Sequence, residues 1–295
     1  MDYLSRVLSA LNAQTFARDQ WELILVDNRS EPPLVGRVNQ DNFPHGELVR
    51  EEIPGLVAAR IRGLREAIGK WIVYVDDDNI LQQDYLEALH QLTVSHPNVA
   101  VWSGSIQPEF EVLPSVRTKP YWKYLAVREV ERTLWSNLPL GEILPCGAGM
   151  AVRRDVMENW TEGLKTHTAR TGLGRKENSL LAGEDTDIGL TACDMGLGVG
   201  LAKTMQLTHL IPARRVEPAY LRKLAYAVTY SHTLLDLLRR RVSNRALIMR
   251  SLWFTRELLQ NNRTGAGIAL WWCQITGVFS AWRYFRQQVQ RTGSR

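Results

Sequence analysis

The segment from Lys70 to Asn79 constrains the fold of this 295-residue chain more than any other stretch. Its first half is an apolar run without polar alternation, which predicts a strand buried on both faces of a sheet. The run ends in three consecutive carboxylates, Asp76, Asp77 and Asp78. Adjacent like charges repel one another, and a divalent cation with oxygen ligands relieves that repulsion. We therefore interpret the segment as a strand leading into a metal or nucleotide site, in preference to a solvated loop.

The position of the acids supports this interpretation. Open α/β sheets bind their ligands at the carboxyl ends of the strands. If the extended geometry continues past the apolar run, Asp76 and Asp78 point to the same side. The sequence thus predicts two carboxylates that act together.

Composition limits the remaining possibilities. With 45% hydrophobic residues, the chain suits one large domain or one domain with an appendage. The net charge of +5 suits an anionic lipid, nucleic acid or phosphorylated partner. The cysteines, Cys146, Cys193 and Cys273, are far apart, which argues against a disulfide framework or a zinc site and fits a reducing compartment. The first 17 residues are amphipathic, so we expect no signal peptide.

Alternating strand and helix patterns predict an α/β sheet. The apolar run from Trp21 to Val26 reads as a second strand that ends in an acid, here Asp27 followed by Asn28. Taken alone, Asp27 is as readily a turn residue or a helix cap. We expect further strands at residues 99–104, 144–152 and 200–208, and helices at residues 55–67, 85–93 and 124–134.

A second acidic cluster, Glu184, Asp185 and Asp187, occupies the predicted start of a helix. Acids in a first turn complement the helix dipole, which is worth about 0.3–1 kcal/mol each. Three acids are more than capping requires, so we interpret the cluster as functional. His209 follows the last predicted strand; a lone histidine is more often structural, but this position is within reach of a ligand on the acids.

The character of the chain changes after residue 214, and we divide it into a domain at 1–214 and a helical region at 215–295. The segment from Ile268 to Phe285 is rich in tryptophan but too short and interrupted for a membrane span, which needs about 20 apolar residues. Its tryptophans and the nearby arginines favour the headgroup level of an anionic membrane. Packing against the first domain or a second subunit explains the aromatic residues equally well.

Taken in order, the motifs resemble those of the inverting family-2 glycosyltransferases with the GT-A fold. The resemblance runs from about Leu4 to Arg214, and each piece is weak alone but specific in series. Val26–Ser30 resembles the uracil-contacting strand end, Gly55–Gly63 the segment before the DxD motif, and Asp76–Asp78 the DxD motif itself. Gly147–Arg153 resembles the strand on the acceptor side, Gly183–Asp185 the catalytic-base motif, and His209 a histidine that contacts the metal or the diphosphate.

The resemblance implies transfer of a sugar from a nucleoside diphosphate donor, a UDP-sugar, to an acceptor hydroxyl with inversion at the anomeric carbon. Asp185 is then the catalytic base, and Glu184 positions it or the acceptor. The resemblance also assigns the other residues: the nucleotide-sugar is held by Asp27, Asn28, Arg60, Asp76 and Asp77, and Gly147, Gly149 and Met150 lie on the acceptor side.

The resemblance further implies a metal cofactor, Mg²⁺ or Mn²⁺, held by Asp78 together with Asp76 and His209. Asp76 contacts the ribose instead if Asp78 is the direct ligand. The implied fold is a mostly parallel GT-A-type sheet flanked by helices, with the C-terminal helices as an appendage. The implied partners are a glycan or lipid-linked acceptor of bacterial-type polysaccharide or glycolipid synthesis, and no nucleic acid. The implied location is cytoplasmic, with peripheral contact to the inner face of the plasma membrane.

The first strand of the family fold, which lies centrally in the sheet, has no counterpart in this sequence. Its absence predicts unpaired backbone groups in the interior, which points to a start further upstream or to a truncated, inactive product. Two other functions stay open. A sugar-phosphate nucleotidyltransferase has a related sheet, although its glycine-rich loop follows that missing strand, and a non-catalytic remnant or binding subunit fits a truncated domain.

Overall fold

A computed structural model describes residues 3–38, 45–139, 141–176, 179–261 and 263–293. The chain forms two compact units. The first unit comprises Met1–Glu109, Val127–Thr166 and Glu184–Leu210. The second unit comprises Phe110–Ala126, His167–Gly183 and Ile211–Arg295, so it contains two segments from the middle of the chain besides the C-terminal helices.

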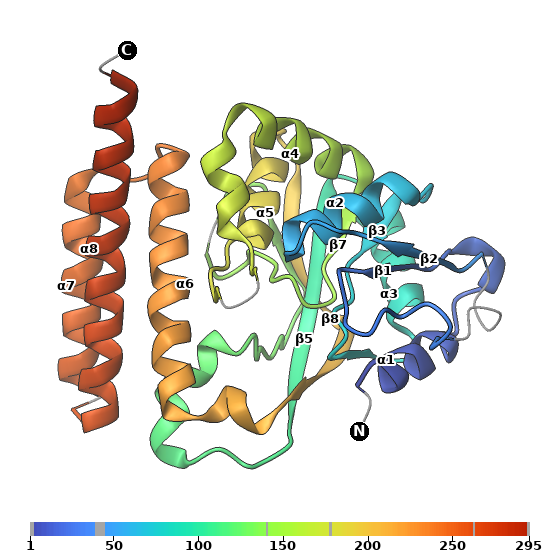
Figure 1. The fold of residues 1–295 in the computed structure, drawn as a ribbon, viewed down its shortest axis with the longest axis horizontal. Coiled ribbons are helices and arrows are strands. Elements are labelled where there is room, and N and C mark those ends of the chain that lie inside the picture. Colours follow the sequence, from blue (N-terminus) through green and yellow to red (C-terminus); the bar gives the residue numbers. More distant parts are fainter. Residues whose placement is uncertain (1–2, 39–44, 140, 177–178, 262, 294–295) are drawn as a thin grey trace. The chain divides into compact units, whose positions relative to one another are not determined.

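The first unit alternates helices and strands (Figure 1). Its α-helices are α1 Tyr3–Asn12, α2 Leu56–Glu66, α3 Tyr85–Ser95, α4 Arg154–Thr166 and α5 Glu184–Asp194. Its strands are β1 Ile24–Asp27, β2 Glu47–Arg50, β3 Trp71–Val73, β4 Asn79–Leu81, β5 Val99–Phe110, β6 Leu134–Ser136, β7 Ala151–Arg153 and β8 Gly198–Ile211. The last residue of β5, Phe110, and the last residue of β8, Ile211, belong to the second unit.

The strands form two sheets in the described part of the chain. The larger sheet has six strands in the order β3-β7-β5-β8-β4, with β6 paired to β8. The smaller sheet consists of β1 and β2 alone. Strands β1 and β3, which both lead into acidic residues, therefore belong to different sheets.

The α/β class, with a central sheet flanked by helices and further helices toward the C-terminus, is confirmed. The direction of pairing differs from the expectation of a mostly parallel sheet. Strands β1 and β2 pair in parallel, whereas β3–β7, β5–β7, β4–β8 and β6–β8 pair antiparallel. An apolar run without alternation indicates that a strand is covered on both faces, but it does not indicate the direction of the neighbouring strands. An antiparallel sheet with helices on both sides buries its strands in the same way.

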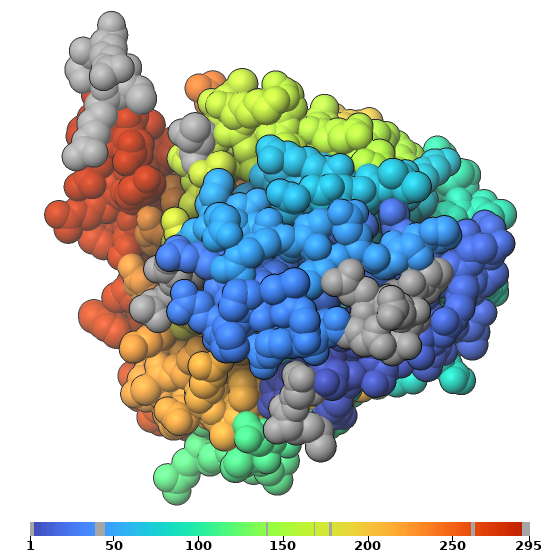
Figure 2. Space-filling model, turned by 45° about the vertical axis from the view of Figure 1, so that its right-hand side comes forward, coloured from blue at the N-terminus to red at the C-terminus, as the bar shows by residue number. Residues whose placement is uncertain are grey.

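Two apolar clusters lie on the two faces of the large sheet. One joins α1 and α3 to side chains of β5 and β8, among them Trp102 and Met205. The other joins side chains of α2, α4 and α5, among them Trp160, to the opposite face of the sheet, which includes Ile72. The first unit is therefore a three-layer structure with helices on both sides of the sheet (Figure 1). In Figure 2 the blue and light-blue atoms of its N-terminal part form one continuous surface beside the yellow-green atoms around α4.

The second unit is mainly helical. Its long helices are α6 Pro218–Leu238, α7 Asn244–Asn261 and α8 Gly265–Gly293, and its 3-10 helices are η2 Val116–Tyr124, η3 Thr168–Leu173 and η4 Ala213–Val216. Helices α6 and α8 approach closely at Gly277, where an added Cβ would lie 3.1 Å from the carbonyl oxygen of Tyr226. The side chains of Lys123 and Glu257 form an ion pair that joins η2 to α7. No described helix has both the length and the apolar character that crossing a membrane requires.

Two local expectations were wrong. The predicted helix at 124–134 is absent, and residues 116–124 form η2 instead, because Pro120 prevents regular α-helical hydrogen bonding there. The predicted strand at 144–152 is shortened to β7, Ala151–Arg153. The residues before it form a loop that contains Gly149 at a φ of 66°, which a strand does not accommodate.

Candidate functional site

The three carboxylates after β3 lie in a turn. The backbone N–H of Asn79 donates to the carbonyl of Asp76 (3.0 Å) and closes this turn. The extended geometry considered from the sequence therefore stops before the acids. Asp76 is half-buried, Asp77 is exposed and Asp78 is buried, so the three adjacent carboxylates have three different environments.

Asp78 lies beside His209 because β4 pairs with β8. The antiparallel register places Asn79 opposite His209. The carboxylate Oδ2 of Asp78 is 3.5 Å from Nε2 of His209. The side-chain amide of Asn79 donates to the other carboxylate oxygen of Asp78 (2.9 Å), and the backbone N–H of Leu210 donates to the Asp78 carbonyl (2.8 Å). The strand register thus builds a buried Asp–His pair and fixes the orientation of its carboxylate.

A charged cluster surrounds Arg60, a residue of α2 that is only 3% exposed. Its Nη1 lies 3.2 Å from Oε1 of Glu184, and its guanidinium lies over the ring of Tyr74, 5.0 Å from the centroid. Burial opposes the charge on Arg60, but the carboxylates of Glu184, Asp76 and Asp185 outweigh it and raise the pKa of the guanidinium. The cation therefore links the acids of the turn after β3 to the acids at the start of α5.

Asp185 is held by backbone donors at the N-terminus of α5. Its Oδ2 accepts a hydrogen bond from the N–H of Gly147 (2.8 Å), and its Oδ1 accepts one from the N–H of Thr186 (2.7 Å). A Cβ at position 147 would lie 2.5 Å from Nη2 of Arg60, so any other residue there would require the guanidinium to shift. The loop before β7 therefore passes between the guanidinium and the Asp185 carboxylate.

Gly149 and Met150 lie deeper in the first unit. A Cβ on Gly149 would lie 2.5 Å from Leu207 and 2.6 Å from the hydroxyl of Tyr85, and that hydroxyl donates to the Gly149 carbonyl. Met150 is fully buried among apolar side chains that include Trp160. Both residues pack the core. Of the three residues expected on the acceptor side, Gly147 lies against the charged cluster.

Asp27, at the end of β1, is buried and held by nearby groups. Its Oδ1 accepts a hydrogen bond from the N–H of Ser30 (2.8 Å), and its Oδ2 accepts from the N–H of Leu34 (3.0 Å) and from Nη1 of Arg50 (2.9 Å). Burial raises the pKa of Asp27, but these donors outweigh burial and leave the pKa below its ordinary value. The side chain of Ser30 also bonds to this carboxylate and lowers its pKa, so four donors share the roughly four lone-pair sites of Asp27.

Asn28 holds the chain that enters α2. Its Oδ1 accepts a hydrogen bond from the N–H of Gly55 (2.8 Å). Its Nδ2 donates to the carbonyls of Ile53 (2.8 Å) and Glu51 (3.4 Å). The amide thus has a partner for its oxygen and for both of its N–H groups, which favours a positioning role for Asn28.

Four residues of these clusters were missed from the sequence. Tyr74 and Asn79 flank the triple aspartate, so their proximity was a usable signal. Arg50 and Tyr85 gave none, because the pairing of β1 with β2 and the packing of α3 under Gly149 appear only in the fold.

The donor set at Asp78 fits a divalent metal that has water or other oxygen ligands in its remaining positions. Mg²⁺ is usually bound by one or two carboxylates, with water and phosphate oxygens in the remaining positions. Beside Asp78 and His209, the buried Oδ1 of Asn79 has no hydrogen-bond partner among the described residues. Within the same residues, no three His, Cys, Asp or Glu side chains converge as a metal-binding group. Of the three expected metal ligands, Asp76, Asp78 and His209, the side chains of Asp78 and His209 lie close together.

The sequence model of the family described as "Glycosyl transferase family 2" matches residues 1–161. "Glycosyltransferase GlyA" of Streptococcus pneumoniae is 30% identical over 98 residues, which span 32% of this chain and 14% of that protein.

Two solved structures match large parts of this chain at low sequence identity. The structure of GalNAc-T7 with UDP, GalNAc and Mn²⁺ matches 79% of this chain and 45% of its own at 14% identity and a TM-score of 0.53. S. aureus TarS 1-349 in complex with UDP-GlcNAc matches 97% of this chain and 88% of its own at 13% identity and a TM-score of 0.49.

Proposed function

The chain belongs to glycosyl transferase family 2, and from this premise we propose that it moves a sugar from a UDP-sugar to an acceptor hydroxyl with inversion at the anomeric carbon. One observation carries the proposal. Buried Arg60 connects the acid turn after β3 with Glu184 and Asp185 at the start of α5. Donor-binding and proton-accepting groups are thereby gathered at one place in the first unit.

Asp185 is the proposed catalytic base. As the acceptor oxygen attacks the anomeric carbon, the Asp185 carboxylate takes the hydroxyl proton, and the bond to the diphosphate leaving group breaks. The two backbone donors, from Gly147 and Thr186, keep the carboxylate in one orientation for that transfer. Glu184 acts through Arg60, which it holds beside Tyr74.

The donor is proposed to lie along the acid turn. Asp78 and His209, with Asp76 and Asp77 beside them, would hold Mg²⁺ or Mn²⁺, which neutralises the charge that develops on the leaving diphosphate. Asp27 would accept an N–H of the base in place of one of its present donors, and Asn28 shapes that end of the site through Gly55. We propose UDP as the donor nucleotide because the structure of GalNAc-T7, which is similar in fold, contains UDP and Mn²⁺.

Calorimetry of UDP binding tests this proposal. We expect wild-type protein to bind UDP more tightly with Mn²⁺ or Mg²⁺ than with a chelator, and Asp78→Asn to lose that metal-dependent gain. Asp84→Asn is the matched control, because Asp84 is an exposed carboxylate a few residues along that forms no side-chain cap. Metal-dependent UDP affinity that survives in Asp78→Asn would contradict the proposed donor site. ADP and GDP in parallel titrations test the choice of uridine.

We also propose that the second unit contacts an anionic membrane surface and that the acceptor is lipid-linked, as in polysaccharide or glycolipid synthesis on the inner face of the plasma membrane. Residues 239–295 contain eleven arginines, no lysine and one acidic residue, Glu257. Helices α7 and α8 also expose large apolar side chains, which are Ile248, Met249, Leu252, Trp253, Leu259, Ile268, Trp272 and Phe279. Exposed tryptophan and phenylalanine with surrounding arginine are typical of helices that lie in the headgroup region.

Liposome flotation tests the membrane contact. We expect the protein to float with vesicles that contain phosphatidylserine at low salt, to float less at high salt, and to stay below with phosphatidylcholine alone. Trp253→Ser combined with Trp272→Ser should reduce flotation, whereas Trp135→Ser, at a half-exposed tryptophan of the first unit, should not. Protein that remains unbound to anionic vesicles at low salt would overturn this part of the proposal.

A further inference from the structure

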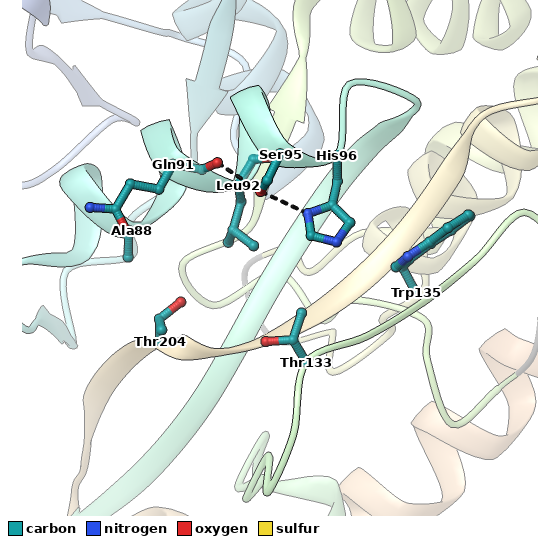
Figure 3. A pocket seen from close by; sticks show the side chains of 8 residues that line it. All are labelled: Ala88, Gln91, Leu92, Ser95, His96, Thr133, Trp135 and Thr204. Carbon is teal, nitrogen blue, oxygen red and sulfur yellow. Dashed lines mark hydrogen bonds between the residues drawn. The ribbon is translucent and has the colours of Figure 1, made fainter.

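A pocket of about 320 Å³ lies in the first unit between the C-terminal half of α3 and the strands β6 and β8 (Figure 3). Its volume is at the lower end of the range for small-ligand pockets, roughly 300–1,000 Å³. It is lined by Ala88, Gln91, Leu92, Ser95, His96, Thr133, Trp135 and Thr204. None of these residues takes part in the transfer chemistry proposed above.

Trp135 forms one wall of the pocket and is held in place from behind. Its backbone lies opposite Gly200 in the β6–β8 register, and its indole packs over Gly198, where an added Cβ would lie 3.3 Å from the ring. Half of the residue is nevertheless exposed. The glycine backing and the exposed remainder make Trp135 a fixed aromatic surface that is accessible to a ligand.

His96 is held in a similar way across the pocket. Its ring meets the fully buried Trp102 edge-on, with the centroids 5.6 Å apart and an interplanar angle of 79°. Its Nδ1 lies 2.9 Å from Oγ of Ser95, as the dashed line in Figure 3 marks. Trp102 in turn lies over Gly200, where a Cβ would come within 2.3 Å of its ring. Two ring side chains of the pocket are thus supported by residues of β5 and β8.

The remaining polar lining carries no formal charge. Gln91, Thr133 and Thr204 contribute an amide and two hydroxyl groups, and none of the eight lining residues is Asp, Glu, Lys or Arg. A phosphate or carboxylate ligand would find no lysine or arginine in the lining to compensate its charge, and burying an uncompensated charge is costly. The lining therefore suits a neutral ligand that has one apolar face and several hydroxyl groups.

We propose that this pocket binds a neutral sugar residue of a glycan chain. A pyranose presents an apolar C–H face that can lie on the Trp135 indole, and hydroxyl groups around its edge that can bond to Gln91, Ser95, Thr133 and Thr204. Helix α3 starts at Tyr85, whose hydroxyl contacts Gly149, and the pocket lies along its later residues, Ala88 to Ser95, which are roughly 4 to 15 Å further along the helix axis. The pocket is thus a second glycan contact, separate from the transfer site, and it does not depend on the proposed donor or base.

Ligand-observed NMR on the full chain tests the proposal. The probes are neutral malto-, cello- and N-acetylchito-oligosaccharides at millimolar concentration, with a hyaluronan oligosaccharide as the acidic comparison, all without UDP or metal. We expect at least one neutral series to bind and Trp135→Ala to weaken it roughly tenfold. Gln91→Ala combined with Thr204→Ala, at two exposed positions, should weaken it as well. Trp253→Ala is the matched control at an exposed tryptophan of α7, and it should bind like wild type.

Each other outcome overturns the proposal. Neutral oligosaccharides that bind none of the proteins exclude a glycan pocket, and binding that is equal in wild type and Trp135→Ala places the contact elsewhere. Preference for the acidic oligosaccharide contradicts the uncharged lining. Thermal unfolding of each variant shows that the fold is intact, and the double substitution provides a second measurement if Trp135→Ala does not fold. Binding that persists in Asp185→Asn separates this pocket from the transfer site, so the two proposals fail independently.

Discussion

The ends of β1 and β3 carry the same kind of sequence, an apolar strand followed by aspartate, but their aspartates have different partners. At the end of β1, Asp27 is held by Ser30, Leu34 and Arg50, all within 23 residues of it. At the end of β3, Asp78 meets His209, and the cluster that includes Asp76 is completed by residues of α5. The first set of contacts closes a local loop, whereas the second assembles groups from distant parts of the chain.

This difference separates two roles for a strand-end carboxylate. Partners nearby in the sequence can satisfy an acid as the chain leaves its strand, and the result is a fixed loop. Partners that are far away in the sequence come together only when the sheet is complete, which gathers charge at one edge. We therefore expect substitutions at the end of β1 to lower stability most, and substitutions around the end of β3 to change binding and turnover.

The largest expected effect is on turnover. Asp185→Asn keeps the shape of the side chain but cannot accept the hydroxyl proton, so sugar transfer should fall by about 10²–10⁴-fold while UDP affinity is kept. Sugar-transfer kinetics and calorimetry on the same preparation measure both quantities. Near-normal turnover would mean that Asp185 only caps α5, and an equal loss of UDP affinity would place it among the nucleotide contacts.

The next effect concerns the buried cation. Arg60→Met leaves Glu184 without its guanidinium partner in a buried position, which should lower the free energy of unfolding by about 3–5 kcal/mol. Urea unfolding measures the change. Arg62→Met on the same helix is the control, because Arg62 pairs with Glu66 at the surface and such pairs are worth about 0.3–0.5 kcal/mol. Equal destabilisation by the two substitutions would show that the buried Arg60–Glu184 pair contributes no more to stability than the Arg62–Glu66 pair.

A smaller effect, dependent on pH, is expected at the end of β1. Because the folded-state pKa of Asp27 lies below its ordinary value of about 3.9, the stabilisation is complete above that value and is lost as the pH falls through the lowered pKa. Asp27→Asn should therefore cost about 1–3 kcal/mol at pH 7 and progressively less below about pH 4. Urea titrations at several pH values measure the difference. A cost that does not change with pH would mean that the ionised form of Asp27 is not what stabilises the loop.

Much of this arrangement could be predicted from the sequence, but not all. The apolar runs before Asp27 and Asp76 revealed both strands, and the acids at 184 and 185 revealed the start of α5, because strand and helix periodicity are local properties. The antiparallel pairing of β4 with β8 could not be predicted, and it is what brings His209 to Asp78. The burial of Arg60 beside Glu184 was equally inaccessible, since its helix read as an ordinary amphipathic helix with a basic face.

The smallest effect tests the comparison most sharply. Asn28→Asp keeps an acceptor for the N–H of Gly55 but removes the donors to the carbonyls of Ile53 and Glu51. The bond to Ile53 is exposed and water can replace the lost donor, so we expect a loss of about 1 kcal/mol in the free energy of unfolding. If Asn28 only positions the chain before α2, UDP affinity should change by less than the roughly fivefold that 1 kcal/mol represents. Parallel urea unfolding and UDP calorimetry give the two numbers. A UDP affinity that falls more than tenfold with unchanged stability would make Asn28 a direct nucleotide contact, and the end of β1 would then act as a binding site like the end of β3.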